Sequence, residues 1–232
     1  MITHEHRVFV NSLVMRQPAD SGKVLIQNSD FEKHVRRSIE ASIEVKQLLL
    51  NDAEALSTIS EVSEILIDAL VQGKKPLLFG NGGSAGDAQH IAAELVGRFA
   101  FDRPALPALA LSVNSSCLTA IGNDYGFDLV FSRQIEALGH PGDVAIGIST
   151  SGNSPNVLNA LTTARKMGLH TVAMTGATGG VLKAAVDHCI CAPSTETPRI
   201  QECHILIGHI LAGLVEQAIF HESSKHVSII TE

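Results

Sequence analysis

The sequence has very few aromatic residues: no tryptophan, one tyrosine and an aromatic share of 4%. Proteins that hold single-stranded nucleic acid by base stacking need aromatic side chains, so the composition argues against this mode of binding. Positive charge is also scarce, because 17 Lys and Arg residues stand against 24 Asp and Glu residues, which gives a formal net charge of −7. Such a chain lacks the basic surface that nucleic acid or an anionic membrane attracts, and we expect neither as a partner.

Cysteine is sparse as well, and neither an export signal nor a membrane span is evident. The first residues, MITHEHRVFVNSLVM, are not basic and then apolar, as a signal peptide is. The longest apolar run near the end, residues 205–215, has 11 residues, and a span requires about 17 to 25. We therefore expect a cytoplasmic protein with reduced, buried thiols. The four cysteines, which form no C-x-x-C pair, are Cys117, Cys189, Cys191 and Cys203.

Length and local pattern predict one domain with an N-terminal extension. A chain of 232 residues can bury an ordinary hydrophobic core without help from a disulfide or a metal. Residues 1–28 show no sustained hydrophobic period, so we interpret them as a loose extension. Residues 29–232 then form a single domain.

This domain is predicted to begin with a helical hairpin. Ser29 and Glu32 match a capping box, and apolar residues at helical spacing follow them to about Leu50. A second apolar stripe over residues 56–70 predicts another helix, with Gly73 at the position of a C-terminal stop.

After the hairpin, short apolar runs alternate with helical patterns. Continuous apolar strands separated by helices predict a three-layer α/β fold, with a parallel sheet covered on both faces. In such folds, ligands bind at the carboxyl ends of the strands. The predicted strands are 76–80, 106–112, 144–149, 170–176 and 188–192, and the helices between them are 84–99, 128–138 and 155–167.

The last predicted helix, residues 198–220, is apolar nearly all round. A helix of this kind must be covered on both sides. We expect another subunit to cover one of them.

Two strand ends continue into loops that suit anions. Residues 80–86 read Gly-Asn-Gly-Gly-Ser-Ala-Gly, and residues 149–155 read Ser-Thr-Ser-Gly-Asn-Ser-Pro. The second loop is the stronger signal, because Ser154 can cap the next helix and Pro155 suits its first position. Free amides at a helix start, with hydroxyls beside them, can hold a phosphate. An ordinary capped turn is the alternative, but two such loops at strand ends favour a phosphate site.

The first loop completes neither of two nucleotide motifs. It lacks the lysine of G-x-x-x-x-G-K-[ST], which argues against nucleotide hydrolysis on a P-loop. Gly80, Gly82 and Ala85 fit a relaxed dinucleotide fingerprint, but the next strand ends in residues 112–114, Ser-Val-Asn, without the acidic residue that binds a ribose.

Polar side chains on two predicted helices are further candidates. His90 and Glu94 lie four residues apart on one helix face, as a metal pair, an acid/base pair or an ordinary surface pair would. His209 is surrounded by apolar residues in the last helix, where it is either a functional group or a core histidine. Spacing alone leaves these alternatives open.

Four motifs together resemble the sugar isomerase (SIS) domain family, and within it the sedoheptulose 7-phosphate isomerases, or phosphoheptose isomerases. The motifs are FGNGGSAGDAQHIAAELVGRF, AIGNDYGFD, STSGNS and RIQECHILIGHIL, and the resemblance covers about residues 30–220. It implies a five-stranded parallel sheet of flavodoxin-like order and a homotetramer with active sites between subunits. It also implies conversion of sedoheptulose 7-phosphate to D-glycero-D-manno-heptose 7-phosphate, the first step toward the heptose of lipopolysaccharide or other surface glycans.

The resemblance assigns roles to individual residues. Glu94 and His209 match the acid/base pair, and moving a carbonyl from C2 to C1 through an enediol requires two such groups. A zinc ion in each subunit is implied as cofactor, although a side chain that coordinates zinc is not free to transfer a proton. The implied zinc ligands are His90, Glu94, Gln201 and His209. The implied substrate contacts are Asn81, Gly82, Gly83, Glu94, Asn123, Asp124, Ser149, Thr150, Ser151, Ser154 and Gln201.

Two other classes share this fold. Catalytically silent relatives are tetrameric binding proteins, such as the factor that organises the bacterial replication initiator, and they lack the acid and the histidine that this chain has at positions 94 and 209. Phosphosugar-sensing regulators carry a DNA-binding domain, for which residues 1–28 are too short. Pro198 departs from the Asp or Ala of the family, so no contact is carried over to that position.

Overall fold

The computed structural model describes residues 28–227. The chain divides into two units, Met1–Ile39 and Glu40–Glu232, and each is described by itself. The described residues of the first unit belong to helix α2 (Asn28–Leu50), which begins one residue before Ser29. The side chain of Ser29 and residues 1–27 of the predicted extension lie outside the described residues, so the capping box and the boundary at residue 28 stay predictions.

Five parallel strands form a sheet in the order β2-β1-β3-β4-β5. This is the flavodoxin-like order implied by the resemblance, so the predicted α/β class is confirmed. The register pairs Gly80 with Ile148 and Ser149 with Thr175, which places the carboxyl ends of β1, β3 and β4 side by side. The strands are β1 (Pro76–Gly80), β2 (Leu109–Ala110), β3 (Val144–Ser149), β4 (His170–Thr175) and β5 (His188–Cys191).

Strand β2 is shorter than the predicted strand 106–112. Pro107 has no N–H to donate to a ladder, and Leu106 donates its N–H to the carbonyl of Leu95 at 3.1 Å. Only Leu109 and Ala110 therefore pair with β1.

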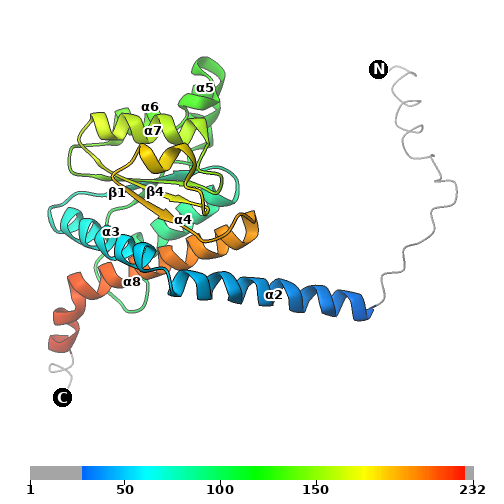
Figure 1. The fold of residues 1–232 in the computed structure, drawn as a ribbon. Coiled ribbons are helices and arrows are strands. Elements are labelled where there is room, and N and C mark those ends of the chain that lie inside the picture. Colours follow the sequence, from blue (N-terminus) through cyan, green and yellow to red (C-terminus); the bar gives the residue numbers. More distant parts are fainter. Residues whose placement is uncertain (1–27, 228–232) are drawn as a thin grey trace, which may run out of the picture. The chain divides into compact units, whose positions relative to one another are not determined.

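Helices cover both faces of the sheet: Figure 1 shows α6 and α7 on one side and α3, α4 and α8 on the other. Successive residues of β1 enter opposite cores, because Leu78 packs with α3, α4 and α8 whereas Leu77 and Phe79 pack with α6 and α7. Burying a side chain of this size stabilises the fold by about 1.5 to 3 kcal/mol. The helices are α3 (Ala53–Val71), α4 (Gly83–Val96), α5 (Ser115–Tyr125), η1 (Phe127–Leu129), α6 (Ser132–Leu138), α7 (Pro155–Lys166), η2 (Gly180–Ala184) and α8 (Thr197–Val227).

Helix α5 is absent from the predicted elements; none of its residues is fully buried, although Leu118 and Ile121 pack partly buried against the core. Its start does have a sequence signal. The side chain of Asn114 accepts a hydrogen bond from the N–H of Cys117 at 3.0 Å, as an N-cap residue does. The predicted helix 128–138 is in turn divided into η1 and α6.

Helix α8 is buried on one side and partly exposed on the other. Ile207, Leu211 and Val215 lie in the core, whereas Ile210 and Leu214 are 38% and 40% exposed. By length and composition its portion Thr197–Phe220 could cross a membrane, although the apolar run in the sequence is shorter. Because 44% of its most apolar window is buried inside the fold, we interpret it as a core helix.

Candidate active site

The two predicted anion loops lie next to each other and are tied together. Asn81 follows β1, Asn156 lies in the first turn of α7, and their side-chain amides exchange two hydrogen bonds of 2.9 Å. Asn156 is buried, so this pair fixes the first loop against the second. The sequence singles out Asn81 as a substrate contact and misses its partner 75 residues away.

Gln201 reaches the first loop from α8. A Cβ atom on Gly83 would overlap the side-chain nitrogen of Gln201, so a side chain at this position would have to displace the amide from the start of α4. The structure therefore brings two predicted substrate contacts, Gly83 and Gln201, together.

The second loop gathers hydroxyl groups at the start of α7. The hydroxyl oxygens of Ser149 and Ser154 lie 2.8 Å apart, and those of Ser149 and Ser151 lie 3.5 Å apart. Ser154 occupies the N-cap position and Pro155 the first helical position, as predicted, but the Ser154 side chain makes no cap hydrogen bond. Its hydroxyl points to Ser149 and does not cap the first turn of α7. The first-turn N–H groups of α7 can therefore bind an anion.

Three of the four predicted zinc ligands form a cluster between α4 and α8. His90 Nε2 lies 2.9 Å from His209 Nε2 and 3.1 Å from Glu94 Oε1. One ligand atom from each of the three residues falls within 4.8 Å of the others. Two imidazoles and a carboxylate are a donor set that zinc accepts in catalytic sites with an open position, so these residues fit the ion. Gln201 lies apart from this cluster, beside Gly83 at the other end of α4.

The geometry fits two alternative interpretations less well: His90 and Glu94 as an ordinary surface pair, and His209 as a core histidine. The side chain of Glu94 is only 22% exposed, and the His90 side chain, 50% exposed, contacts both Glu94 and His209. The His209 ring faces the rings of His90 and Phe99, with centroids 5.1 and 5.6 Å away. The three side chains thus form one half-open polar group.

A buried ion pair holds the chain that follows α4. Glu216 of α8 accepts hydrogen bonds from the Arg103 side chain (2.9 Å) and the backbone N–H groups of Phe99 (3.0 Å) and Ala100 (2.7 Å). Burial alone would raise the pKa of Glu216, but these bonds outweigh it and hold the pKa below the ordinary value. Arg103 also donates to the carbonyl of Glu94 at 2.8 Å, so the pair supports the backbone of a candidate catalytic residue. Nothing in the sequence pattern distinguishes Arg103 or Glu216.

Two more ionisable groups, Asp87 of α4 and His204 of α8, carry perturbed pKa values. Burial raises the pKa of Asp87, one turn before His90, and its Oδ2 atom has no hydrogen-bond partner among the described residues. Burial lowers the pKa of His204 to about 4, so this ring is neutral at pH 7, and its Nε2 lies 3.0 Å from the Thr175 carbonyl.

Asn123 and Asp124 lie apart from the other predicted contacts. Both are exposed on the last turn of α5, and the Asn123 amide donates to the Asp124 carboxylate at 2.8 Å. Within residues 28–227, no hydrogen bond joins either side chain to the two loops or to the His–Glu cluster. Their role in substrate binding stays a prediction.

Comparison with known proteins agrees with this fold and this site. The family model described as SIS domain matches residues 42–176. A phosphoheptose isomerase of Sulfurimonas denitrificans is 54% identical over 191 residues, which cover 82% of this chain and 97% of the relative. One of Aneurinibacillus thermoaerophilus is 54% identical over 84% of this chain and 98% of its own length. The structure of phosphoheptose isomerase from Neisseria gonorrhoeae superimposes with a TM-score of 0.76 and 42% identity, over 81% of this chain and 99% of that one.

The parallel sheet with its two loops and the family match define a SIS domain protein. Within that class, the chain belongs to the phosphoheptose isomerase family, whose members are ketose–aldose isomerases. The family resemblance predicted from the four motifs is therefore confirmed.

Proposed function

We propose that the chain converts sedoheptulose 7-phosphate to D-glycero-D-manno-heptose 7-phosphate, as the first step toward the heptose precursor of lipopolysaccharide or another surface glycan. The observation that carries this proposal is the contact of Glu94 and His209 with the same His90 ring. A carboxylate and an imidazole held this close form the two-group set that an enediol mechanism needs. The names of the relatives support the substrate class.

The loop after β3 is proposed to bind the phosphate. The hydroxyls of Ser151 and Ser154 each lie within 3.5 Å of the Ser149 hydroxyl, and the start of α7 adds amide dipoles that favour an anion. Thr150 belongs to the same loop, whose backbone is held there by a hydrogen bond of 3.0 Å from the N–H of Gly176 to the Thr150 carbonyl, and we propose its hydroxyl as a further phosphate contact. The phosphate would then fix the sugar chain relative to the cluster.

Proton transfer is proposed to follow in two steps. Glu94 removes a proton from C1 while His209 gives one to the carbonyl oxygen at C2, which forms the enediol. Glu94 then returns its proton to C2, and His209 takes the proton from the oxygen at C1 to leave the aldehyde. Positioned acid and base groups of this kind contribute about 10² to 10⁴ in rate.

We propose zinc as the cofactor, held by His90, Glu94 and His209. When bound, zinc polarises the carbonyl and stabilises negative charge on the enediolate oxygens. A ligating side chain cannot transfer a proton at the same moment, so the mechanism above applies to the groups while they are not coordinated. Gln201, implied as the fourth ligand, would have to come from another subunit, because its own amide lies beside Gly83.

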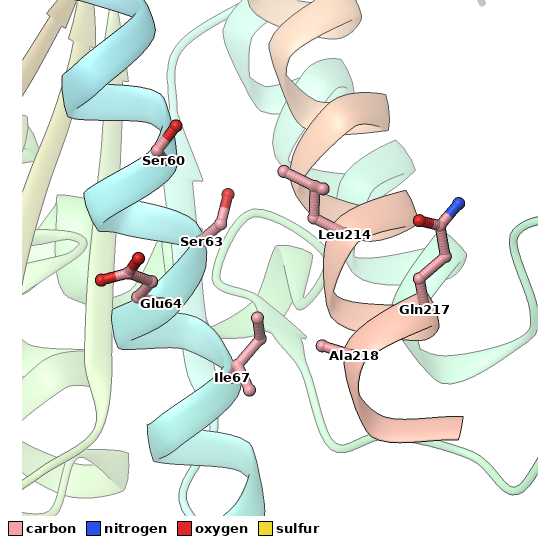
Figure 2. Close-up of a pocket in the computed structure, with 7 residues that line it drawn as sticks. All are labelled: Ser60, Ser63, Glu64, Ile67, Leu214, Gln217 and Ala218. Carbon is pink, nitrogen blue, oxygen red and sulfur yellow. The ribbon is translucent and has the colours of Figure 1, made fainter. Parts of the chain in front are cut away.

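A homotetramer is proposed as the active assembly. A hollow of about 450 Å³ lies between α3 and α8. Figure 2 shows Ser63 and Ile67 on one side of it facing Leu214 and Ala218 on the other. The exposed side of α8 and this hollow are partly apolar, as a surface that another subunit covers would be. The net charge of −7 favours neither nucleic acid nor membrane as a partner, and we propose a cytoplasmic location.

The competing proposal is a catalytically silent binding protein with the same fold. It is disfavoured by the His90, Glu94 and His209 contacts, since a binding protein does not require an acid and an imidazole in one group.

The decisive experiment incubates the purified protein with sedoheptulose 7-phosphate and follows the aldose phosphate by proton NMR. We expect an aldehyde-derived anomeric signal with wild type and none with Glu94→Gln, which keeps the size of the side chain and removes its basicity. If wild-type protein with its native metal forms no aldose phosphate, the isomerase proposal fails and the binding class is favoured.

A further inference from the structure

A pair of cysteines lies outside the candidate active site, on the edge strand β5. Cys189 and Cys191 are two residues apart in the strand and therefore face the same side, with their sulfur atoms 3.7 Å apart. The hydroxyl of Thr175, on the neighbouring strand β4, lies 3.6 Å from the Cys189 sulfur and 3.5 Å from the Cys191 sulfur. Two thiols and one hydroxyl thus lie within hydrogen-bond distance of one another.

The pair is open to small molecules. A polar hollow of about 180 Å³ is lined by both cysteines, by Lys183 of η2 and by Asp52 and Glu54 at the start of α3. Neither cysteine is fully buried. A reagent of the size of a peroxide can therefore reach the sulfur atoms.

The two thiols are not equivalent. The hydrogen bond from Cys189 is the main cause that lowers the pKa of Cys191, burial opposes it, and Thr175 and Lys183 add to the lowering, so that the pKa is about 6. The same bond, together with burial, raises the pKa of Cys189. Cys191 is thus the thiolate and Cys189 the protonated thiol beside it, the division that a nucleophilic and a resolving cysteine require.

The strand can accommodate a bond between them. Two residues of a strand span about 6.6 Å, which is near the upper end of the Cα separations seen in disulfides, about 6.8 Å. Among residues 28–227, strand β5 pairs with β4 alone, and it ends at Cys191, so it can shorten slightly without loss of a second ladder.

We propose that Cys189 and Cys191 form a peroxide-reactive dithiol that closes to an intramolecular disulfide. The Cys191 thiolate attacks one oxygen of hydrogen peroxide, the O–O bond breaks, and hydroxide leaves to become water, which converts Cys191 to a sulfenic acid. The Cys189 sulfur then attacks the Cys191 sulfur and loses its proton, and the S–O bond breaks to release a second water. Two thiols are oxidised and one peroxide is reduced to two waters. This site is independent of the proposed isomerase reaction.

The test uses the full-length protein at pH 6, treated with hydrogen peroxide, quenched with N-ethylmaleimide and digested with trypsin. Residues 184–199 form one tryptic peptide that holds Cys189 and Cys191 and neither of the other cysteines. We expect this peptide to lose two hydrogen masses and to carry no maleimide, while Cys117 stays alkylated. Maleimide on both cysteines after treatment would overturn the proposal, and so would a sulfinic acid at Cys191 beside an alkylated Cys189.

Variants test the roles of Cys191 as the nucleophile and Cys189 as the resolving cysteine. At pH 6 a thiol of pKa about 6 is half ionised, whereas about 0.3% of an ordinary thiol is ionised. The thiolate of lower pKa is about tenfold less nucleophilic, which offsets part of the gain in rate from its larger thiolate fraction. The Cys191→Ala variant should therefore consume peroxide at least about tenfold more slowly than wild type. The Cys189→Ala variant should stop at a sulfenic acid that dimedone traps, and Cys117→Ala is the matched control with an unchanged rate. Equal rates for Cys191→Ala and wild type would refute the assignment of Cys191 as nucleophile.

Discussion

The ion pair of Arg103 and Glu216 offers a prediction whose size follows from burial. The two side chains are 1% and 0% exposed, and the carboxylate also accepts the N–H groups of Phe99 and Ala100. The Glu216→Gln substitution keeps the shape but removes the charge and turns one acceptor into a donor. It leaves Arg103 buried without a counter-ion, which costs about 3 to 5 kcal/mol of unfolding free energy.

Urea unfolding at pH 7 measures this loss. With a slope of about 2 kcal/mol per molar urea, a loss of about 3 kcal/mol lowers the midpoint by about 1.5 M. Glu136→Gln is the matched control, because this exposed glutamate should change the free energy by less than about 0.5 kcal/mol. A Glu216→Gln loss below about 1 kcal/mol would refute the interpretation of the pair as a buried support.

The same pair predicts a dependence on pH. The pKa of Glu216 is lower in the folded protein than its ordinary value of 4.5. Its contribution to stability is therefore fully present above pH 4.5 and is lost as the pH falls through the folded-state pKa. The difference in midpoint between wild type and Glu216→Gln should accordingly shrink below pH 4.5, and a difference that stays constant down to pH 2 would contradict this assignment.

Three further predictions concern the candidate site. Glu94→Gln and His209→Ala should each lower kcat at least about 10²-fold, and the double variant should be little worse than either single variant. Turnover normalised to the folded fraction distinguishes this loss of catalysis from a loss of stability. Replacing Ser151 and Ser154 together by alanine should raise KM at least about tenfold, because each lost hydrogen bond to a charged group costs about 1.5 to 3 kcal/mol; an unchanged KM would move the phosphate elsewhere. We expect metal binding to depend on assembly, so zinc content should fall when the tetramer dissociates. Metal analysis that finds full zinc content in a folded, dissociated protomer would contradict this dependence.

The fold could be predicted from the sequence where burial is regular. Strand β3 lies at the predicted residues, because its six residues are all buried and form a continuous apolar run. Prediction failed where local features compete with the pattern. Pro107 shortens β2, and α5 has no fully buried residue, so its clearest signal is the cap at Asn114.

Residue spacing predicted only the local part of the candidate site, and the family resemblance supplied the grouping of residues from different helices. The four-residue spacing placed His90 and Glu94 on one face of α4, and the structure confirms their contact at 3.1 Å. It could not show that His209, 119 residues further on, completes the group. Pairs of this kind depend on how two helices pack, which no local pattern in one sequence encodes.

The packing of α4 on α8 shows why the cluster forms where it does. Gly208 precedes His209, and a Cβ atom at this position would overlap the side chain of Ile91, which follows His90. The glycine thus lets the two helices approach at the point where the histidines meet, and Gly83 does the same for Gln201 at the start of α4. The contact of His209 with His90 therefore depends on the close approach of the two helices at Gly208.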